Sequence, residues 1–83
     1  MVLELIPVHS NVKSFGGKAI VETFEDGRVN LLSYYTLVAT IEDGRAIVFG
    51  TYSSTTLRHI KEFLLQNGFK ATSKKQIEND YMT

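Results

Sequence analysis

The chain contains no cysteine, and this absence limits what can hold it together. Of its 83 residues one is proline, and none is cysteine or tryptophan. Without thiols there is no disulfide and no cysteine-ligated metal, and only His9 and His59 remain as imidazole ligands. We therefore predict no metal site and no cofactor. A chain of this size has a small core, so its stability has to come from packing, with self-association as an additional option.

Long hydrophobic runs are missing as well. A membrane-spanning helix needs about 18 or more consecutive apolar residues, and no run in this sequence approaches that length. The N-terminal stretch carries Glu4 among its apolar residues and no basic residue before it, which is not the pattern of a signal peptide. Together with the absence of cysteine, these features predict a soluble cytoplasmic protein that does not bind membranes.

A net charge is also lacking, but the charges are unevenly distributed. Nine acidic and nine basic side chains give a formal charge of zero, in a chain that is 43% hydrophobic and 22% charged. This composition is typical of a globular protein. Residues 55–75 hold five cations and a single acid, namely Arg58, Lys61, Lys70, Lys74 and Lys75 against Glu62. Such a basic segment is compatible with a solvated helix or with a face that binds a polyanion.

The most informative pattern that is present is a short motif that occurs twice, an internal echo in the sequence. Residues 21–29 and 38–46 each contain Glu-Asp-Gly-Arg between two apolar runs. Asp-Gly is a strong hairpin signal, because the turn requires positive φ, which Gly adopts freely and Asp tolerates. The flanking Val, Ile, Thr and Phe residues favour strands. The echo therefore predicts two β-hairpins, with strands near residues 18–24, 28–33, 36–42 and 45–50.

Further elements surround the predicted hairpins. Residues 2–6 suit an additional strand, ended by Pro7. Residues 32–36, between the hairpins, contain neither Gly nor Pro, so we expect a bulge or a short turn there, or one long bent strand. Apolar residues at helical spacing, preceded by Ser and Thr and followed by Asn67-Gly68, predict a helix over residues 55–67. On the outer side of this helix Arg58 and Glu62 are expected to face solvent at i, i+4 spacing.

We predict one α+β domain over residues 1–83. Two antiparallel hairpins and an N-terminal strand form its sheet, which packs against one C-terminal amphipathic helix. The tail, about residues 70–83, has the capping-box spacing of Ser73 and Gln76, so it forms either a short helix near 74–81 or a frayed end. The strands are apolar on both faces, whereas one helix covers only one. The N-terminal segment, the tail or a second copy must cover the other face, so a homodimer is one expected state.

Two stretches together resemble a known family. They are Leu32-Ser33-Tyr34-Tyr35-Thr36-Leu37-Val38-Ala39 and Tyr52-Ser53-Ser54-Thr55-Thr56-Leu57-Arg58-His59-Ile60-Lys61-Glu62-Phe63-Leu64. Their order is similar to that in a family of small uncharacterised proteins from bacteriophages and mobile elements. In that family a Ser-Tyr-x-Thr-x-Val-Ala strand precedes a Tyr-Ser-x-Thr-Thr-x-Arg-His-Ile-x-Glu-Phe-Leu helix start. The resemblance covers residues 32–64 and implies a phage-type origin, with the host cytoplasm as location, but no particular chemistry.

The start of the predicted helix carries the main candidate binding site. A helix N-terminus offers free backbone N–H groups and the positive end of the helix dipole. Hydroxyl, guanidinium and imidazole groups cluster around it, from Tyr52, Ser53, Ser54, Thr55, Thr56, Arg58 and His59. This cluster is compatible with a pocket for a phosphate or carboxylate. The alternative is a redundant N-cap, with Arg58 and His59 facing solvent or the sheet.

His59 and three tyrosines each have two interpretations. His59 titrates near neutrality and could act as a general base with Glu62 as its carboxylate, but no spacing supplies a nucleophile. A structural histidine at the boundary of helix and sheet is therefore favoured. Tyr34, Tyr35 and Tyr52 could stack nucleic-acid bases. Core packing with one solvated hydroxyl each is the simpler expectation.

Enzymatic activity is not expected, because the sequence shows no nucleophile–base set, metal site or cofactor motif. We expect a small phage-type accessory protein that acts by binding another protein, such as a host factor. The first alternative is a nucleic-acid-binding module that uses the basic segment 55–75. The second is a domain that binds an anionic ligand at the helix N-terminus.

Overall fold

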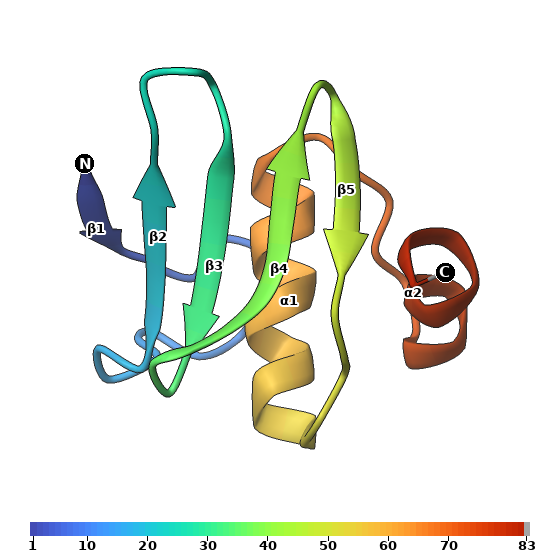
Figure 1. Ribbon diagram of the computed structural model, residues 1–83. Helices are drawn as coiled ribbons and strands as arrows, with labels where there is room; N and C mark the ends of the chain where they lie inside the picture. The colour runs from blue at the N-terminus through green and yellow to red at the C-terminus, as the bar shows by residue number, and fades with distance from the viewer. Residues whose placement is uncertain (83) are drawn as a thin grey trace.

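The computed structural model of the protein describes residues 1–82 and has five strands and two helices. The strands are β1 (Val2–Glu4), β2 (Ala19–Thr23), β3 (Val29–Ser33), β4 (Thr36–Glu42) and β5 (Arg45–Val48), and the helices are α1 (Ser54–Gln66) and α2 (Lys74–Tyr81). The strands form one antiparallel sheet in chain order, β1-β2-β3-β4-β5 (Figure 1). The predicted α+β fold is confirmed. Within residues 1–82 no helix is long and apolar enough to cross a membrane.

The two Asp-Gly turns form as predicted. Asp43 and Gly44 both have positive φ, 54° and 73°, in the turn between β4 and β5. In the turn between β2 and β3, Gly27 has a φ of 91° and the Asp26 carboxylate accepts the backbone N–H of Arg28 at 2.9 Å. Each turn therefore uses the residue types that tolerate its backbone conformation.

The connection between the hairpins combines a bulge and a tight turn. The register of β3 and β4 shifts between Leu31 and Leu32, which marks a β-bulge. Ser33 then pairs with Thr36, which leaves a turn of only two residues between the strands. The expected bulge or short turn is confirmed, and the long bent strand is not formed.

Helix α1 packs across one face of the sheet, behind it in the view of Figure 1. Ser53 is its N-cap, and its hydroxyl accepts the backbone N–H of Thr56 at 3.2 Å. Gly68, with a φ of 83°, follows the C-cap residue Asn67. The core between helix and sheet consists of fully buried apolar side chains, including Ile60, Phe63 and Leu64 of α1 and Leu31 and Ala39 of the sheet.

The tail is a helix rather than a frayed end. The Ser73 hydroxyl caps α2 by accepting the backbone N–H of Gln76 at 3.1 Å. The reciprocal half of the capping box is displaced by one residue, because the Gln76 side chain accepts from the backbone N–H of Thr72 instead. Helix α2 packs beside β5 and contributes Ile77, which is fully buried, to the core. Position 83 of the predicted tail lies outside the described residues.

The face of the sheet opposite α1 is not covered by any part of residues 1–82. Ile20, Leu32 and Leu37 are paired across β2, β3 and β4, and Leu37 keeps 42% of its surface exposed. Strand β1 is shorter than expected and extends the sheet at its edge. Among the described residues, no segment passes in front of the strands in Figure 1. The need for another cover, inferred from the sequence, therefore remains for a single copy.

Candidate functional site: the tyrosine end of the sheet

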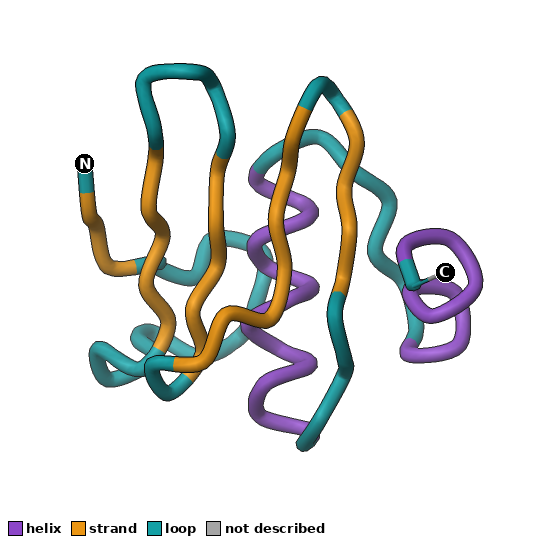
Figure 2. Tube along the Cα trace, in the orientation of Figure 1, coloured by secondary structure: helices purple, strands orange, loops and turns teal. Residues whose placement is uncertain are grey.

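Three exposed tyrosines lie at one end of the sheet. Tyr34 and Tyr35 form the turn between β3 and β4, and Tyr52 lies in the connection from β5 to α1; both connections are at the same end in Figure 2. Tyr34, Tyr35 and Tyr52 are 50%, 82% and 61% exposed. The expectation that they pack in the core is wrong, because they lie in turns beyond the strand ends. We call these three residues the tyrosine end.

All three tyrosines have a left-handed backbone. The φ angles are 50° at Tyr34, 67° at Tyr35 and 50° at Tyr52. Positive φ is uncommon for residues other than glycine, asparagine and aspartate. Two consecutive residues with positive φ between paired strands are the pattern of a type I′ turn, where Asn-Gly is preferred. For a residue other than glycine, the left-handed conformation costs roughly 1–2 kcal/mol.

The ring of Tyr52 lies against the backbone at Gly50. A Cβ atom placed on Gly50 would stand 2.9 Å from both Cε2 and Cζ of Tyr52. Real Cβ atoms essentially never approach other heavy atoms so closely. Since Gly50 does not have positive φ, its value at this position lies in the space that it leaves for the tyrosine ring.

A buried polar network lies between helix and sheet, next to the tyrosine end. The Ser33 hydroxyl lies 2.8 Å from Nδ1 of His59 and 3.0 Å from the Thr56 hydroxyl. The His59 ring also contacts the edge of Phe15, with centroids 4.6 Å apart, and the ring of Tyr34 at 5.9 Å. Burial lowers the pKa of His59, which favours the neutral imidazole. These contacts place His59 between helix and sheet, in a structural environment.

The residues of the predicted anion pocket are distributed over different places. The Ser53 hydroxyl is used by the N-cap, while Thr56 and His59 are bonded to β3. Ser54 and Thr55 are exposed in the first turn of α1. Tyr52, Ser53 and Ser54 line a hollow of about 150 Å³, together with Thr51, Leu57 and Lys74. The structure thus joins Lys74, rather than Arg58 or His59, to the helix N-terminus.

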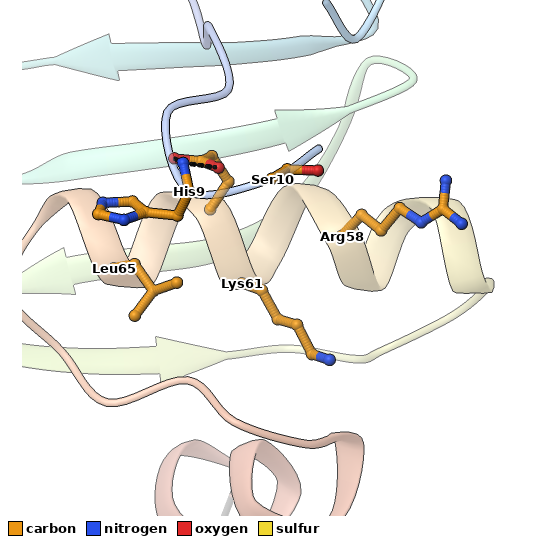
Figure 3. Close-up of a pocket in the computed structure, with 6 residues that line it drawn as sticks. His9, Ser10, Arg58, Lys61 and Leu65 are labelled. Atoms are coloured by element: carbon orange, nitrogen blue, oxygen red, sulfur yellow. Dashed lines mark hydrogen bonds between the residues drawn. The ribbon is translucent and has the colours of Figure 1, made fainter. Parts of the chain in front are cut away.

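Arg58 lines a separate hollow of about 150 Å³ beside the N-terminal segment. His9, Ser10, Lys61, Glu62 and Leu65 form the rest of its lining. In Figure 3 the Arg58 and Lys61 side chains extend in different directions from the helix. Their charges therefore do not converge on a common point, as they would in an anion pocket.

Glu62 is a buried carboxylate that the sequence analysis placed in solvent, which was wrong. It is 2% exposed, and its two oxygens accept the backbone N–H of His9 at 2.9 and 3.1 Å (Figure 3). Gln66 Nε2 donates to the same carboxylate at 2.7 Å. Burial raises the pKa of Glu62, but hydrogen bonds from Gln66, Val8 and His9 and the charge of His9 outweigh it and hold the pKa below its usual value. The carboxylate thus bonds to the N-terminal segment rather than to Arg58 or His59. Local spacing could not reveal a partner this distant in sequence.

The sequence matches a described family over most of its length. The match is to the family of unknown function DUF8033 and covers residues 3–79. Comparisons with curated proteins and with solved structures found no match. The matched region includes the tyrosine end, the Ser33–His59 contact and both helix starts. The predicted resemblance to an uncharacterised family is confirmed to this extent, and the chain belongs to family DUF8033.

Proposed function

We propose that this protein is a non-catalytic, phage-type accessory protein that binds a host protein through its tyrosine end. The observation that carries the proposal is the combination of exposure and backbone conformation at Tyr34, Tyr35 and Tyr52. Tyrosine is enriched in protein interfaces, because its large rigid ring buries area at little entropic cost and its hydroxyl can bond to the partner.

The left-handed backbone of the exposed tyrosines supports a binding role. Tyr35 is 82% exposed, so its ring contributes little packing to the fold. In the same turn Asn or Gly would be more stable than an aromatic residue. Residues held in such sparsely populated backbone conformations cluster at functional sites. On this proposal, a contact between the tyrosine rings and a second molecule offsets the free-energy cost of the left-handed backbone.

Two further observations support binding rather than catalysis. Ser33 and His59 have the residue types of a nucleophile and base and lie within hydrogen-bond distance, but they are only 2% and 1% exposed. A substrate would have no access to either atom. The phage-type origin rests on the resemblance of residues 32–64, and a host protein is the partner that such an origin suggests.

The test is affinity capture from a nuclease-treated bacterial lysate, with the bound proteins identified by mass spectrometry. The wild-type chain is compared with a Tyr34→Asn/Tyr35→Gly/Tyr52→Asn variant, which removes all three rings and suits the left-handed backbone. We expect one host protein to be retained by the wild type and lost with the variant, whose melting temperature is unchanged or higher.

A matched control removes an exposed aromatic ring elsewhere. Phe24 is 38% exposed in the connection between β2 and β3, at the opposite end of the sheet. Phe24→Ala is expected to retain the partner. If the triple variant captures the same protein as the wild type, or if Phe24→Ala loses it equally, the tyrosine end is not the contact surface.

Nucleic-acid binding is the second candidate. It is favoured by Lys74, which lines the same hollow as Tyr52 and so places a cation from the basic segment beside an exposed aromatic ring. This candidate predicts that the captured material disappears on nuclease treatment. It also predicts that binding weakens steeply with salt, because each phosphate contact releases counterions.

A further inference from the structure

We propose that β1 is a dimerisation strand, which pairs in antiparallel fashion with β1 of a second copy of this chain. The two sheets would then form one continuous sheet around a twofold axis at Leu3. This contact lies at the sheet edge, away from the tyrosine end, so it stands independently of the proposed function.

Hydrogen bonds to β2 establish which backbone groups of β1 are free. Met1 and Thr23 exchange both backbone hydrogen bonds, at 2.9 and 2.8 Å, and the Leu5 N–H donates to the Ala19 carbonyl at 2.8 Å. Odd-numbered residues of β1 therefore direct their N–H and C=O groups toward β2. Because these directions alternate along a strand, the groups of Val2 and Glu4 point to the outer edge. Among residues 1–82, no strand pairs with that edge (Figure 1).

The free groups select one register between two copies. Even-numbered residues must lie opposite even-numbered residues in order to exchange hydrogen bonds. Val2 opposite the partner's Glu4 uses the free groups of both residues. Glu4 opposite the partner's Glu4 would place like charges face to face, which is destabilising, and Val2 opposite the partner's Val2 would leave Glu4 unpaired. The remaining register places the twofold axis at Leu3.

Side chains around β1 supply an apolar surface for this contact. Leu3, Ile6 and Val8 are 57%, 52% and 71% exposed. Leu3 is paired with Val21 and lines a hollow of about 420 Å³ beside α1, with further apolar lining from Ile6, Val8, Val21 and Val29. In the selected register the partner's Leu3 stands opposite Leu3 on this face and covers the mouth of the hollow.

A second copy fits this edge because the contact has to be self-complementary. A twofold interface brings the same patch together from both chains. Strand β1 satisfies this condition in three ways. The outward backbone groups of Val2 and Glu4 can bond to those of the second copy, the two Glu4 carboxylates do not lie directly opposite each other, and the exposed Leu3 side chains of the two copies meet. The strand has only three residues, so we expect a weak dimer, with a dissociation constant on the order of 100 μM.

Disulfide trapping tests the register directly. The chain has no cysteine, so Leu3→Cys introduces a single thiol. Residues facing each other in a non-hydrogen-bonded pair have Cα atoms about 4.5 Å apart, within the range of a disulfide. We expect Leu3→Cys to form a covalent dimer under mild oxidation and Val2→Cys, which faces Glu4, to form much less. Equal trapping of both variants, or of neither, would overturn the proposal.

A proline variant tests the edge in the untagged chain without a new covalent bond. Val2→Pro removes an N–H that points away from β2, so the fold and the melting temperature should be retained. Sedimentation velocity at up to about 1 mM protein, roughly ten times the expected dissociation constant, should show a dimer for the wild type and a monomer for Val2→Pro. A wild-type monomer over the whole range, or an undiminished Val2→Pro dimer, would refute the contact.

Discussion

The Ser33 hydroxyl lies 2.8 Å from Nδ1 of His59, so the last residue of β3 is bonded directly to α1. The same hydroxyl lies 3.0 Å from that of Thr56, one turn earlier in the helix. All three side chains are buried, and hydrogen bonds are stronger in such an environment than in water. The network therefore holds the start of α1 against the end of β3, next to the turn that contains Tyr34 and Tyr35.

Removing the Ser33 hydroxyl should destabilise the fold. Ser33→Ala leaves the His59 nitrogen and the Thr56 hydroxyl buried without their partner, at a cost of about 1–3 kcal/mol. Urea denaturation followed by circular dichroism measures this change. Ser54→Ala, at an exposed position of the same helix, is the control and should change the stability by less than about 0.5 kcal/mol. A Ser33→Ala loss no larger than the control would contradict the role of the network.

The stability of the protein should fall in mildly acidic solution because of His59. Burial lowers the pKa of His59 in the folded protein, so the unfolded chain binds this proton more tightly. The contribution is fully present above the unfolded pKa of about 6.5 and is lost as the pH falls from there toward the lowered folded pKa. Denaturation midpoints of the wild type, measured between about pH 5 and 8, should show this slope.

Two histidine variants separate the sources of this pH dependence. His59→Gln should flatten the slope in the mildly acidic range, whereas His9→Gln, at an exposed position, should leave most of it. A slope that persists in His59→Gln would show that another group is responsible.

Tyr35 should be replaceable by glycine with a gain in stability. Tyr35→Gly relieves the left-handed strain at a φ of 67° and removes a ring that is 82% exposed, so the expected gain is about 1 kcal/mol. Thr36→Gly is the matched control, because Thr36 is the first residue of β4 and glycine weakens a strand. Thermal denaturation should give opposite signs for the two variants. A destabilised Tyr35→Gly would mean that the ring contributes to the fold itself.

Gly50→Ala should disturb Tyr52 without removing it. The new methyl group would stand 2.9 Å from two ring atoms, so the ring has to move, while the alanine backbone itself is not strained. We expect altered NMR chemical shifts for the Tyr52 ring and weaker retention of the captured partner. In a Tyr52→Asn background, Gly50→Ala should have no further effect on retention. Additive losses would show that Gly50 acts independently of the tyrosine.

The hairpins and helices could be predicted because their signals are local. Asp43-Gly44 predicts a turn, because both residue types tolerate the positive φ that the turn requires. Ser53 and Ser73 precede helices that they cap through a neighbouring N–H group. Each of these interactions joins residues that are only a few positions apart in the sequence, so sequence spacing is sufficient to identify it.

The candidate site was less predictable, because burial depends on contacts between distant segments. Glu62 was placed in solvent by helical periodicity, but residues 8–9 pack over it and supply hydrogen bonds. Tyr34 and Tyr35 were expected in the core, because packing with one solvated hydroxyl is the simpler account of a tyrosine in a small protein. Neither residue is the Gly or Asn that normally marks a two-residue turn. The three tyrosines were named as candidates from the sequence, but their exposure in the turns was therefore not predicted.

The contact between Glu62 and His9 joins positions 53 residues apart. Every strand pair joins neighbours in the chain, so the sheet closes short loops, whereas this contact closes a long one at greater entropic cost. We expect the N-terminal segment to dock after the transition state for folding. Glu62→Gln should then accelerate unfolding while leaving the folding rate nearly unchanged in stopped-flow experiments; slower folding would show early docking. On this view the buried carboxylate governs the lifetime of the native state rather than the speed of its formation.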